Sequence, residues 1–333
     1  TMVAITGDLT GDGIEDLVVG APMEDVDELG TNAGVVTIYR GTSEGFEVQP
    51  AAMLKGFRTH GQGDEFGTAV FDLGDVDGDG RGDLGVLSRV EDLPGAGQFL
   101  DGMTADGACE YGAQGVGALY VFRGTGDGAP QAEPAFIVYG LKLGSRVDSV
   151  LGGVDINGDG LHDIVAGNSL YDVPAEPELD EDGDPVVVNN QGAVAVYLGR
   201  PAAADGTTLV LCSPAALITG RQGAGRFGVQ LASVGDLPVG GTQGDGCSDF
   251  VVSAFNEEYT IESEGALHVV RGWGGVGCPA EPEVAVFAPD IFGADTGIRM
   301  AGGDLDGDGV YDIVFGSPTF VSGASRLGAI WFV

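Results

Sequence analysis

Length, composition and charge exclude several classes of protein for this chain of 333 residues. Its formal net charge is −37, from 51 acidic and 14 basic residues. Nucleic acid is therefore not expected as a partner, because phosphate contacts need clustered Lys and Arg. A hydrophobic content of 43% excludes a disordered chain. No apolar run approaches the ~18 residues of a membrane span, and no signal-peptide pattern follows Thr1.

A nine-residue acidic loop occurs first at 8–16 and then returns along the chain. Its copy at 75–83 is the most regular, with Asp at positions 1, 3, 5 and 9 and Gly at position 6. This spacing offers a ring of hard oxygen ligands, which calcium prefers. Further copies begin at residues 155, 236 and 304, and the copy at 236–249 carries extra residues. Self-similarity of this kind indicates a repeat architecture.

The apolar runs around the first loop predict four short strands, at 2–6, 17–22, 34–41 and 51–56. Gly, Pro and Asp clusters separate these runs and no helical period is present, which is typical of an antiparallel meander. One such sheet has two apolar faces and cannot be stable alone. We therefore expect several sheets to pack side by side around an axis.

The later repeats show the same order of strands. Predicted strands lie at 66–71, 84–87, 117–124 and 135–140, then at 147–154, 164–167, 192–199 and 214–220, then at 227–234, 250–254, 265–272 and 284–288, and finally at 297–301, 313–318 and 328–333. Insertions at 89–116 and 170–191 are expected to be solvated surface loops, with a binding loop as the alternative. The last repeat lacks a fourth strand. Two explanations stay open: the chain is a fragment of a longer propeller, or a neighbouring polypeptide adds the edge strand.

Two short motifs flank the loops. Phe66-Gly67 precedes one loop and Gly20-Ala21-Pro22 follows another, with near copies at Phe227-Gly228, Phe292-Gly293 and Gly316-Ser317-Pro318. In this order the motifs resemble the FG-GAP repeat of integrin α-subunits and of many bacterial extracellular proteins. The resemblance covers nearly the whole chain. It implies an all-β fold, a β-propeller of about five four-stranded antiparallel blades with the last blade incomplete, although integrin propellers have seven.

The same resemblance implies one domain, 1–333, and a set of calcium ligands. The repeats would span approximately 1–56, 57–140, 141–220, 221–288 and 289–333. Ca²⁺ would lie between the first two strands of a blade, held by positions 1, 3, 5 and 9 and by a carbonyl at position 7. The implied ligands are Asp8, Thr10, Asp12, Ile14 and Asp16; Asp75, Asp77, Asp79, Arg81 and Asp83; Asp155, Asn157, Asp159, Leu161 and Asp163; and Asp304, Asp306, Asp308, Val310 and Asp312.

The fourth loop departs from this pattern. Asp245 and Asp249 keep their places, but the spacing then puts Gln243 at position 3 and Gly241 at position 1. Asp236 could fill position 1 only through a bulge. We therefore expect four calcium sites and leave a fifth, in this loop, open.

Three other interpretations of the loops are weaker. An EF-hand needs Glu at position 12, and that position holds Val19, Val86, Ala166 or Phe315 inside predicted strands. Simple β-turns do not explain the carboxylate at position 9. The tripeptide Arg81-Gly82-Asp83 spells an adhesion motif, but its Asp is an implied ligand, so the match is taken as incidental.

Four cysteines occur without CxxC spacing, which argues against zinc. Their even number suggests an oxidising exterior with disulfides, and four buried free thiols are the alternative. Cys247–Cys278 is the preferred disulfide, because the two connections that carry these residues share one face of a meander. Cys212 is the competing partner, and Cys109 would then be free or intermolecular.

The expected function is that of a calcium-stabilised protein-binding, adhesion or structural assembly module, extracellular or at the cell surface. It is not expected to be an enzyme, because none of the three His lies in a recognisable nucleophile motif. A carbohydrate-binding propeller and the non-catalytic part of a larger secreted enzyme are the alternatives. A protein partner or assembly neighbour is expected, with the open edge of the last blade as one surface. A glycan is the other candidate partner.

Overall fold

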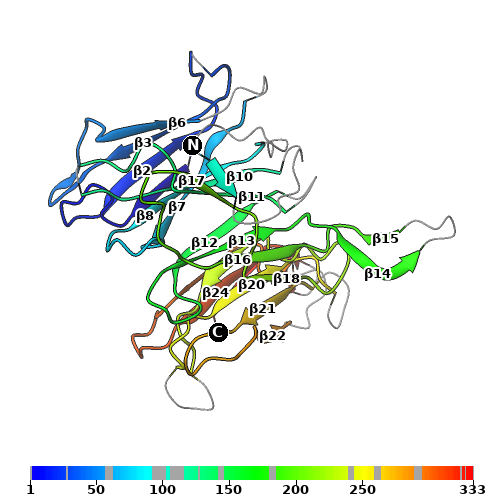
Figure 1. The fold of residues 1–333 in the computed structure, drawn as a ribbon. Coiled ribbons are helices and arrows are strands. Elements are labelled where there is room, and N and C mark those ends of the chain that lie inside the picture. The colour runs from blue at the N-terminus through cyan, green and yellow to red at the C-terminus, as the bar shows by residue number, and fades with distance from the viewer. Residues whose placement is uncertain are drawn as a thin grey trace. The chain divides into compact units, whose positions relative to one another are not determined.

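The computed structural model describes residues 2–27, 29–56, 63–91, 103–105, 116–126, 128–141, 146–179, 185–238, 244–258, 264–288, 295–322, 325–326 and 328–332. Every regular element within these ranges is a β-strand (Figure 1). The chain divides into two compact units. The first comprises Thr1–Val147, Leu161–Ile164 and Gly199–Pro214, and the second Asp148–Gly160, Val165–Leu198 and Ala215–Val333. Over the described ranges no helix has the length and apolarity to cross a bilayer.

The first sheet is the predicted meander. It has the order β1 (Met2–Thr6), β2 (Asp16–Ala21), β3 (Val35–Tyr39) and β6 (Ala52–Lys55), and all its pairings are antiparallel. Alternate residues of β2 are buried, as the period of two along a strand requires, and in β3 Val35, Val36 and Ile38 are buried. The acidic loop 8–16 is the connection between β1 and β2.

The second sheet is larger than the sequence predicts. Its order is β7 (Phe66–Gly74), β8 (Asp83–Ser88), β10 (Ala118–Phe122), β11 (Phe136–Tyr139), β17 (Thr208–Leu211) and β9 (Met103–Ala105). The last two strands pair in parallel, β17 with β11 and β9 with β17. All four residues of β11 are buried, so the backbone groups at its outer edge need partners, and β17 supplies them.

Two four-stranded antiparallel sheets follow. One has the order β12 (Ser149–Val154), β13 (Asp163–Asn168), β16 (Ala193–Tyr197) and β18 (Ala216–Thr219). The other, in the second unit, has the order β19 (Leu231–Ser233), β20 (Phe250–Ala254), β21 (Ala266–Val270) and β22 (Val284–Phe287). Both follow the predicted order of strands, and each contains an acidic loop between its first two strands.

The last sheet has three described strands, β23 (Met300–Gly303), β24 (Asp312–Ser317) and β27 (Ala329–Phe332). Three two-stranded hairpins complete the fold: β4 (Gly41–Thr42) with β5 (Gly45–Phe46), β14 (Val173–Leu179) with β15 (Pro185–Val188), and β25 (Val321–Ser322) with β26 (Ser325–Arg326). The insertion at 170–191, expected to be a loop, therefore contains a hairpin. The insertion at 89–116 contributes β9 to the second sheet.

The Phe-Gly motif has a packing explanation. The ring of Phe66 is fully buried and lies edge-on to Tyr120 and Phe122, at centroid distances of 5.7 and 6.1 Å. Gly67 has a φ of 86°, in the left-handed region that favours glycine. A Cβ on Gly20 would lie 2.1 Å from the carbonyl oxygen of Gly67, so the two glycines allow β2 and β7 to approach closely. The motif thus marks a contact between neighbouring sheets.

Candidate metal centres

All five acidic loops share one turn geometry. In each, the Asp at position 1 accepts a hydrogen bond from the backbone N–H of the Gly at position 6. These bonds join Gly13 to Asp8 (2.6 Å), Gly80 to Asp75 (2.8 Å), Gly160 to Asp155 (2.8 Å), Gly246 to Asp236 (2.7 Å) and Gly309 to Asp304 (3.0 Å). The five glycines have φ between 85° and 96°, which only glycine adopts readily. Position 1 therefore closes the turn in every copy.

The Asp at position 9 ties its loop to the third strand of the same sheet. In four loops one of its oxygens accepts from the N–H of the glycine after that strand. The bonds run from Gly41 to Asp16 (3.0 Å), Gly124 to Asp83 (3.2 Å), Gly199 to Asp163 (2.8 Å) and Gly272 to Asp249 (2.8 Å). These four Asp residues are 0% exposed. A buried carboxylate with backbone donors is held in a fixed orientation.

The loop at 75–83 gathers the most carboxylates. Ligand atoms of Asp75, Asp77 and Asp83 all lie within 4.8 Å of one another. Val76 N–H donates to the second oxygen of Asp83 at 3.0 Å, so this side chain cannot swing away. The backbone N–H of Asp79 donates to Asp75 and Asp77, at 3.0 and 3.2 Å. Three of the four carboxylates that the sequence selects therefore belong to one cluster, and the backbone of Asp79 is bonded to two of them.

Burial makes this cluster electrostatically unfavourable without a cation. Removal from water, followed by the neighbouring charge of Asp77, raises the pKa of Asp83 to about 7. Burial also raises the pKa of Asp77, although Arg123 opposes the shift. In the fourth loop burial likewise raises the pKa of Asp249. A divalent ion would reverse these shifts by favouring the charged carboxylates.

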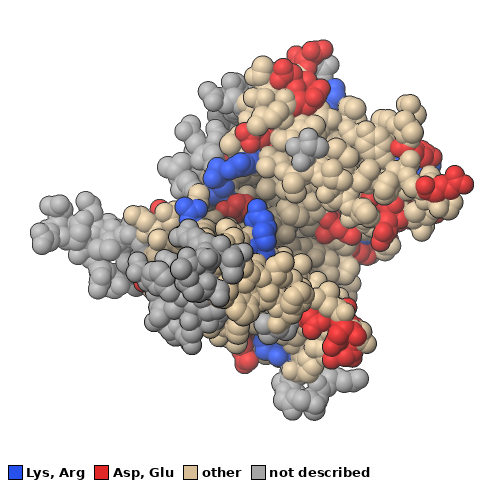
Figure 2. All heavy atoms as spheres, turned by 180° about the vertical axis from the view of Figure 1, so that it is seen from behind, with Lys and Arg blue, Asp and Glu red and all other residues tan. Residues whose placement is uncertain are grey.

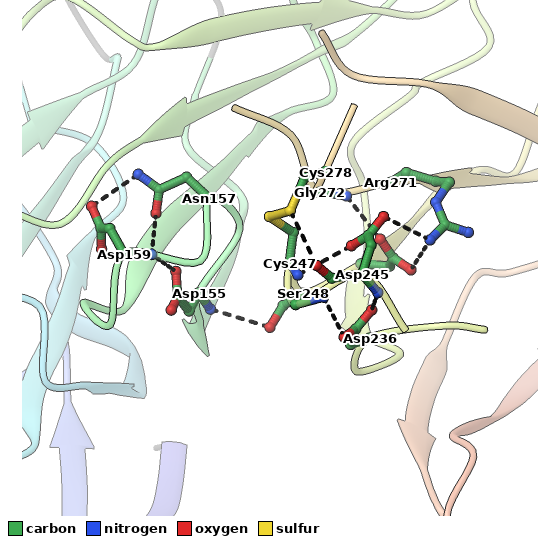
Figure 3. The surroundings of a disulfide bond; sticks show 12 residues. Asp155, Asn157, Asp159, Asp236, Asp245, Cys247, Ser248, Arg271, Gly272 and Cys278 are labelled. Atoms are coloured by element: carbon green, nitrogen blue, oxygen red, sulfur yellow. Dashed lines mark hydrogen bonds and ion pairs between the residues drawn. A yellow bond between two sulfur atoms is a disulfide. The ribbon is translucent and has the colours of Figure 1, made fainter. Parts of the chain in front are cut away.

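The fourth loop regains its position 1 through Asp236. Asp236 accepts from Asp245 N–H at 2.8 Å and from Gly246 N–H at 2.7 Å, and Leu237 N–H donates to Asp249 at 2.9 Å. Figure 3 shows Asp236 beside the turn that carries Asp245. The extra residues follow Asp236 in the sequence, and Asp236 still reaches the turn at Asp245 and Gly246. Gly241 and Gln243 lie outside the described residues.

Several other predicted ligands make hydrogen bonds within their own loops. In the first loop, Thr10 is buried and both its N–H and its hydroxyl reach Asp16, at 2.8 and 3.2 Å. In the third loop, Asn157 donates to Asp159 at 2.9 Å. In the last loop, ligand atoms of Asp304, Asp306 and Asp308 lie within 4.8 Å of one another, but all three residues are exposed, and Asp312 accepts from Leu305 N–H at 2.8 Å. This last loop is the most open to solvent.

Residues at position 7 share a backbone hydrogen bond in four of the loops. Their backbone N–H groups donate to the Asp at position 5 in four loops, from Ile14 to Asp12 (2.9 Å), Arg81 to Asp79 (3.0 Å), Cys247 to Asp245 (3.1 Å) and Val310 to Asp308 (2.8 Å). Leu161 holds position 7 in the remaining loop. The side chain of Asp83 is fully buried, so the adhesion tripeptide at 81–83 does not present its carboxylate to a partner.

Arginines after the third strands were not found from the sequence. Arg40, Arg123 and Arg271 each follow the last residue of β3, β10 or β21 and precede the glycine that binds position 9. Each guanidinium makes an ion pair with a carboxylate of its own loop. The recurring Arg-Gly pair was the available signal. It is easily overlooked because arginine at the end of a strand is usually solvated.

Residues at position 8 link consecutive loops within a unit. In the first unit, His162 N–H donates to the Asp75 carbonyl at 2.8 Å, and Asp75 N–H donates to His162 Nδ1 at 2.8 Å. In the second unit, Ser248 and Asp155 make the same exchange, at 2.7 and 3.3 Å (Figure 3). Each junction thus fixes the backbone of a position 1 residue from the next loop.

A disulfide anchors the fourth loop. Cys247 and Cys278 are bonded, which confirms the preferred pairing (Figure 3). Cys212 is also disulfide-bonded, so it does not compete for either residue. Cys109 lies outside the described residues. The bonded sulfurs of Cys247 and Cys278 lie close to Asp245, but they are not thiolates and cannot serve as zinc ligands.

Negative charge extends well beyond the loops. Positions 1, 3, 5 and 9 of the five loops hold 17 of the 51 acidic residues. On the face that Figure 2 shows, Asp and Glu form several separate groups, and Lys and Arg are fewer. Most acidic residues therefore lie outside these loop positions.

The donor set fits a hard divalent cation. Each loop offers several carboxylate or amide oxygens around one tight turn, without imidazole or thiolate donors. Calcium takes six to eight oxygen ligands in flexible geometry, whereas softer metals prefer nitrogen and sulfur. The loops are thus chemically suited to calcium, and most clearly so at 75–83.

Comparison with known proteins agrees with the fold and the loops. The FG-GAP repeat family matches residues 3–39 and 296–333. This chain contains FG-GAP repeats. It is 30% identical over 174 residues to integrin alpha-PS2 of Drosophila melanogaster, and 32% identical over 167 residues to integrin alpha-6 of Gallus gallus. It is 28% identical over 190 residues to phosphatidylinositol-glycan-specific phospholipase D of Homo sapiens.

These FG-GAP similarities cover about half of the chain and a small part of each relative. They span 49%, 48% and 56% of this chain, but 11%, 12% and 20% of the relatives' own lengths. The recurring four-stranded antiparallel sheets, with a loop between the first two strands, have the form of propeller blades.

Proposed function

We propose that this FG-GAP chain is a calcium-stabilised, extracellular β-propeller module that binds another protein or holds an assembly together. The observation that carries the proposal is the shared turn geometry of the five loops, and it is supported by carboxylate oxygens that lie within 4.8 Å of one another at 75–83 and at 304–308. Positions 1, 3, 5 and 9 would hold the ion in each loop, with the position 7 carbonyl. The fourth loop would take part through Asp236, Asp245 and Asp249.

The role of the ion would be structural. Calcium supplies positive charge among carboxylates that otherwise repel one another. The chain's own residues do the rest: position 9 fixes the loop to the third strand, and in two loops position 8 is bonded to position 1 of the preceding loop. An ion bound there would stiffen both the hairpin and its junction, and leave the opposite ends of the sheets free to present binding loops.

An extracellular role is supported by two observations. The Cys247–Cys278 disulfide is typical of oxidising compartments. The integrin alpha relatives make a protein partner and a cell-surface context the best-supported proposals. Most of these relatives are integrin alpha subunits, which favours a non-enzymatic module. The match to a phospholipase D favours one second candidate, a non-catalytic part of a larger secreted enzyme.

Calcium titration of the chelated full chain tests the proposal. Isothermal titration should show four to five sites, and the midpoint of thermal unfolding should rise with free calcium. Magnesium should substitute poorly, because it demands tighter octahedral geometry. No heat of binding and an equal midpoint in calcium and in EDTA would refute the calcium assignment.

A further inference from the structure

Three arginines occupy equivalent places beside three of the loops. Arg40, Arg123 and Arg271 each follow a third strand directly. Each also precedes the glycine whose N–H binds the position 9 carboxylate. The backbone that holds the loop therefore also delivers the guanidinium to it. The same placement occurs in three repeats and in both units, which indicates a recurring structural position and not a chance surface contact.

Each guanidinium faces the oxygens that would bind the ion. Arg123 pairs with Asp77 through Nε and with Asp79 through Nη2, the latter at 3.0 Å. Arg271 Nη2 lies 3.3 Å from Asp245 Oδ2 and 3.6 Å from Asp249 Oδ2 (Figure 3).

The first loop repeats this contact more loosely, because Arg40 Nε lies 3.5 Å from Asp12 Oδ2. The partners of Arg123 and Arg271 are more strongly buried than those of Arg40: the side chains of Asp77 and Asp249 are 1% and 0% exposed, whereas that of Asp12 is 28% exposed. Arg123 and Arg271 thus each have a contact shorter than that of Arg40, and each also reaches a carboxylate that is buried.

The other two loops lack this arginine. The residue after the third strand is Leu198 in the third repeat and Val333 in the fifth. In the third loop a neutral donor, Asn157 Nδ2, reaches Asp159 at 2.9 Å. The last loop combines four carboxylates with no basic residue at this place. The chain thus contains loops with and without a counter-charge supplied by the third strand.

We propose that Arg40, Arg123 and Arg271 are built-in counter-cations that hold their loops when no divalent ion is bound and thereby lower the affinity for calcium. The inference rests on the proposed function, since it concerns residues that face the calcium ligands. An arginine meets full negative charge in the ion-free loop and neutralised charge in the ion-bound loop. Its removal therefore raises the free energy of the ion-free form more than that of the ion-bound form. By linkage the ion then binds more tightly.

Arg123→Gln tests this with a site-specific measurement. Hydrogen exchange of the segment 75–83, followed by mass spectrometry at a series of free calcium concentrations, reports occupancy of that loop alone. In EDTA the variant should exchange faster than the native chain. The free calcium at half protection should fall about tenfold, the size of one charge-assisted hydrogen bond. Arg123→Lys keeps the charge, so its midpoint should stay near the native value.

Arg299→Gln is the matched control, because it removes the same charge from a residue that donates to the carbonyl of its neighbour Ile298. It should change neither result. A midpoint that is unchanged or higher in Arg123→Gln would overturn the proposal and make Arg123 an orienting residue. If Arg123→Gln fails to fold, Arg40→Gln repeats the test on the loop 8–16, with the same two outcomes. Absence of calcium-dependent protection in every loop of the native chain would instead refute the calcium assignment itself.

Discussion

Asp83→Asn separates the metal role of a position 9 residue from its structural role. The side chain is 0% exposed and accepts from Val76 N–H at 3.0 Å and from Gly124 N–H at 3.2 Å. Asn has the same shape but only one acceptor atom and no charge. We expect the substitution to have little effect on the ion-free protein and to remove most of the stabilisation by calcium at this loop.

The expected magnitudes follow from opposing terms. Burial, followed by the charge of Asp77, raises the pKa of Asp83 from 3.8 to about 7, and a shift of about 3 units corresponds to roughly 4 kcal/mol against the ionised form. Asn avoids this cost above pH 7. It leaves one backbone N–H without an acceptor, which costs about 1–3 kcal/mol. In EDTA at pH 8 the variant should therefore match or slightly exceed the native stability. Calcium at ~1,000 times its dissociation constant stabilises a site by about 4 kcal/mol, which the variant should largely lose.

Urea unfolding of the native chain and of Asp83→Asn, each in EDTA and in saturating calcium, gives the four free energies of unfolding that are compared. Asp205→Asn is the matched control, because Asp205 is an exposed Asp whose side chain accepts from Thr207 in a surface turn. It should leave the difference between calcium and EDTA unchanged. If Asp83→Asn lost equal stability in both conditions, Asp83 would be a structural hydrogen-bond acceptor only, and the argument for an ion at 75–83 would fail.

Two further predictions follow from the site. Because the folded pKa of Asp83 is raised above its unfolded value of 3.8 to about 7, its contribution to the stability of the ion-free protein is greatest below pH 4 and is lost as the pH rises to about 7. Calcium affinity should increase over the same window, and urea unfolding and calcium titrations at pH 5 and 8 would show both trends; flat profiles would contradict the buried cluster. Cys247→Ser should lower the free energy of unfolding by about 4 kcal/mol, from the loop-entropy relation for a separation of 31 residues. Urea unfolding measures this change, and an unchanged stability would show that the disulfide constrains the unfolded chain little.

The parts that follow from local rules could be predicted from the sequence. The five loops, the meander order and the motif at Phe66-Gly67 depend on residues close in the chain, where turn chemistry and the period of two decide the conformation. The preferred disulfide, Cys247–Cys278, followed from the same topology.

The parts that depend on distant segments could not be predicted. β17 joins β11 in parallel, although the two strands are about seventy residues apart and belong to different repeats. The apolar run 208–211 indicated a strand, but residues close to it in the sequence do not determine which sheet edge that strand will pair with. Asp236 was ambiguous for a related reason. The hydrogen bond from Gly246 N–H identifies Asp236 as the carboxylate that closes the turn. The residues inserted after Asp236 hide this correspondence when the loops are compared by sequence spacing.

The contacts between loops bear on how far an ion's effect extends. His162 holds the backbone of Asp75, and Ser248 holds the backbone of Asp155, so a residue at position 8 of one loop braces position 1 of another. In repeat proteins, stability is approximately the sum of terms within repeats and terms between neighbours. An ion that rigidifies position 1 therefore strengthens a term of each kind. Calcium at these FG-GAP loops would therefore stabilise the junctions between sheets. A stronger hairpin, or a larger core within one sheet, would not stabilise those junctions.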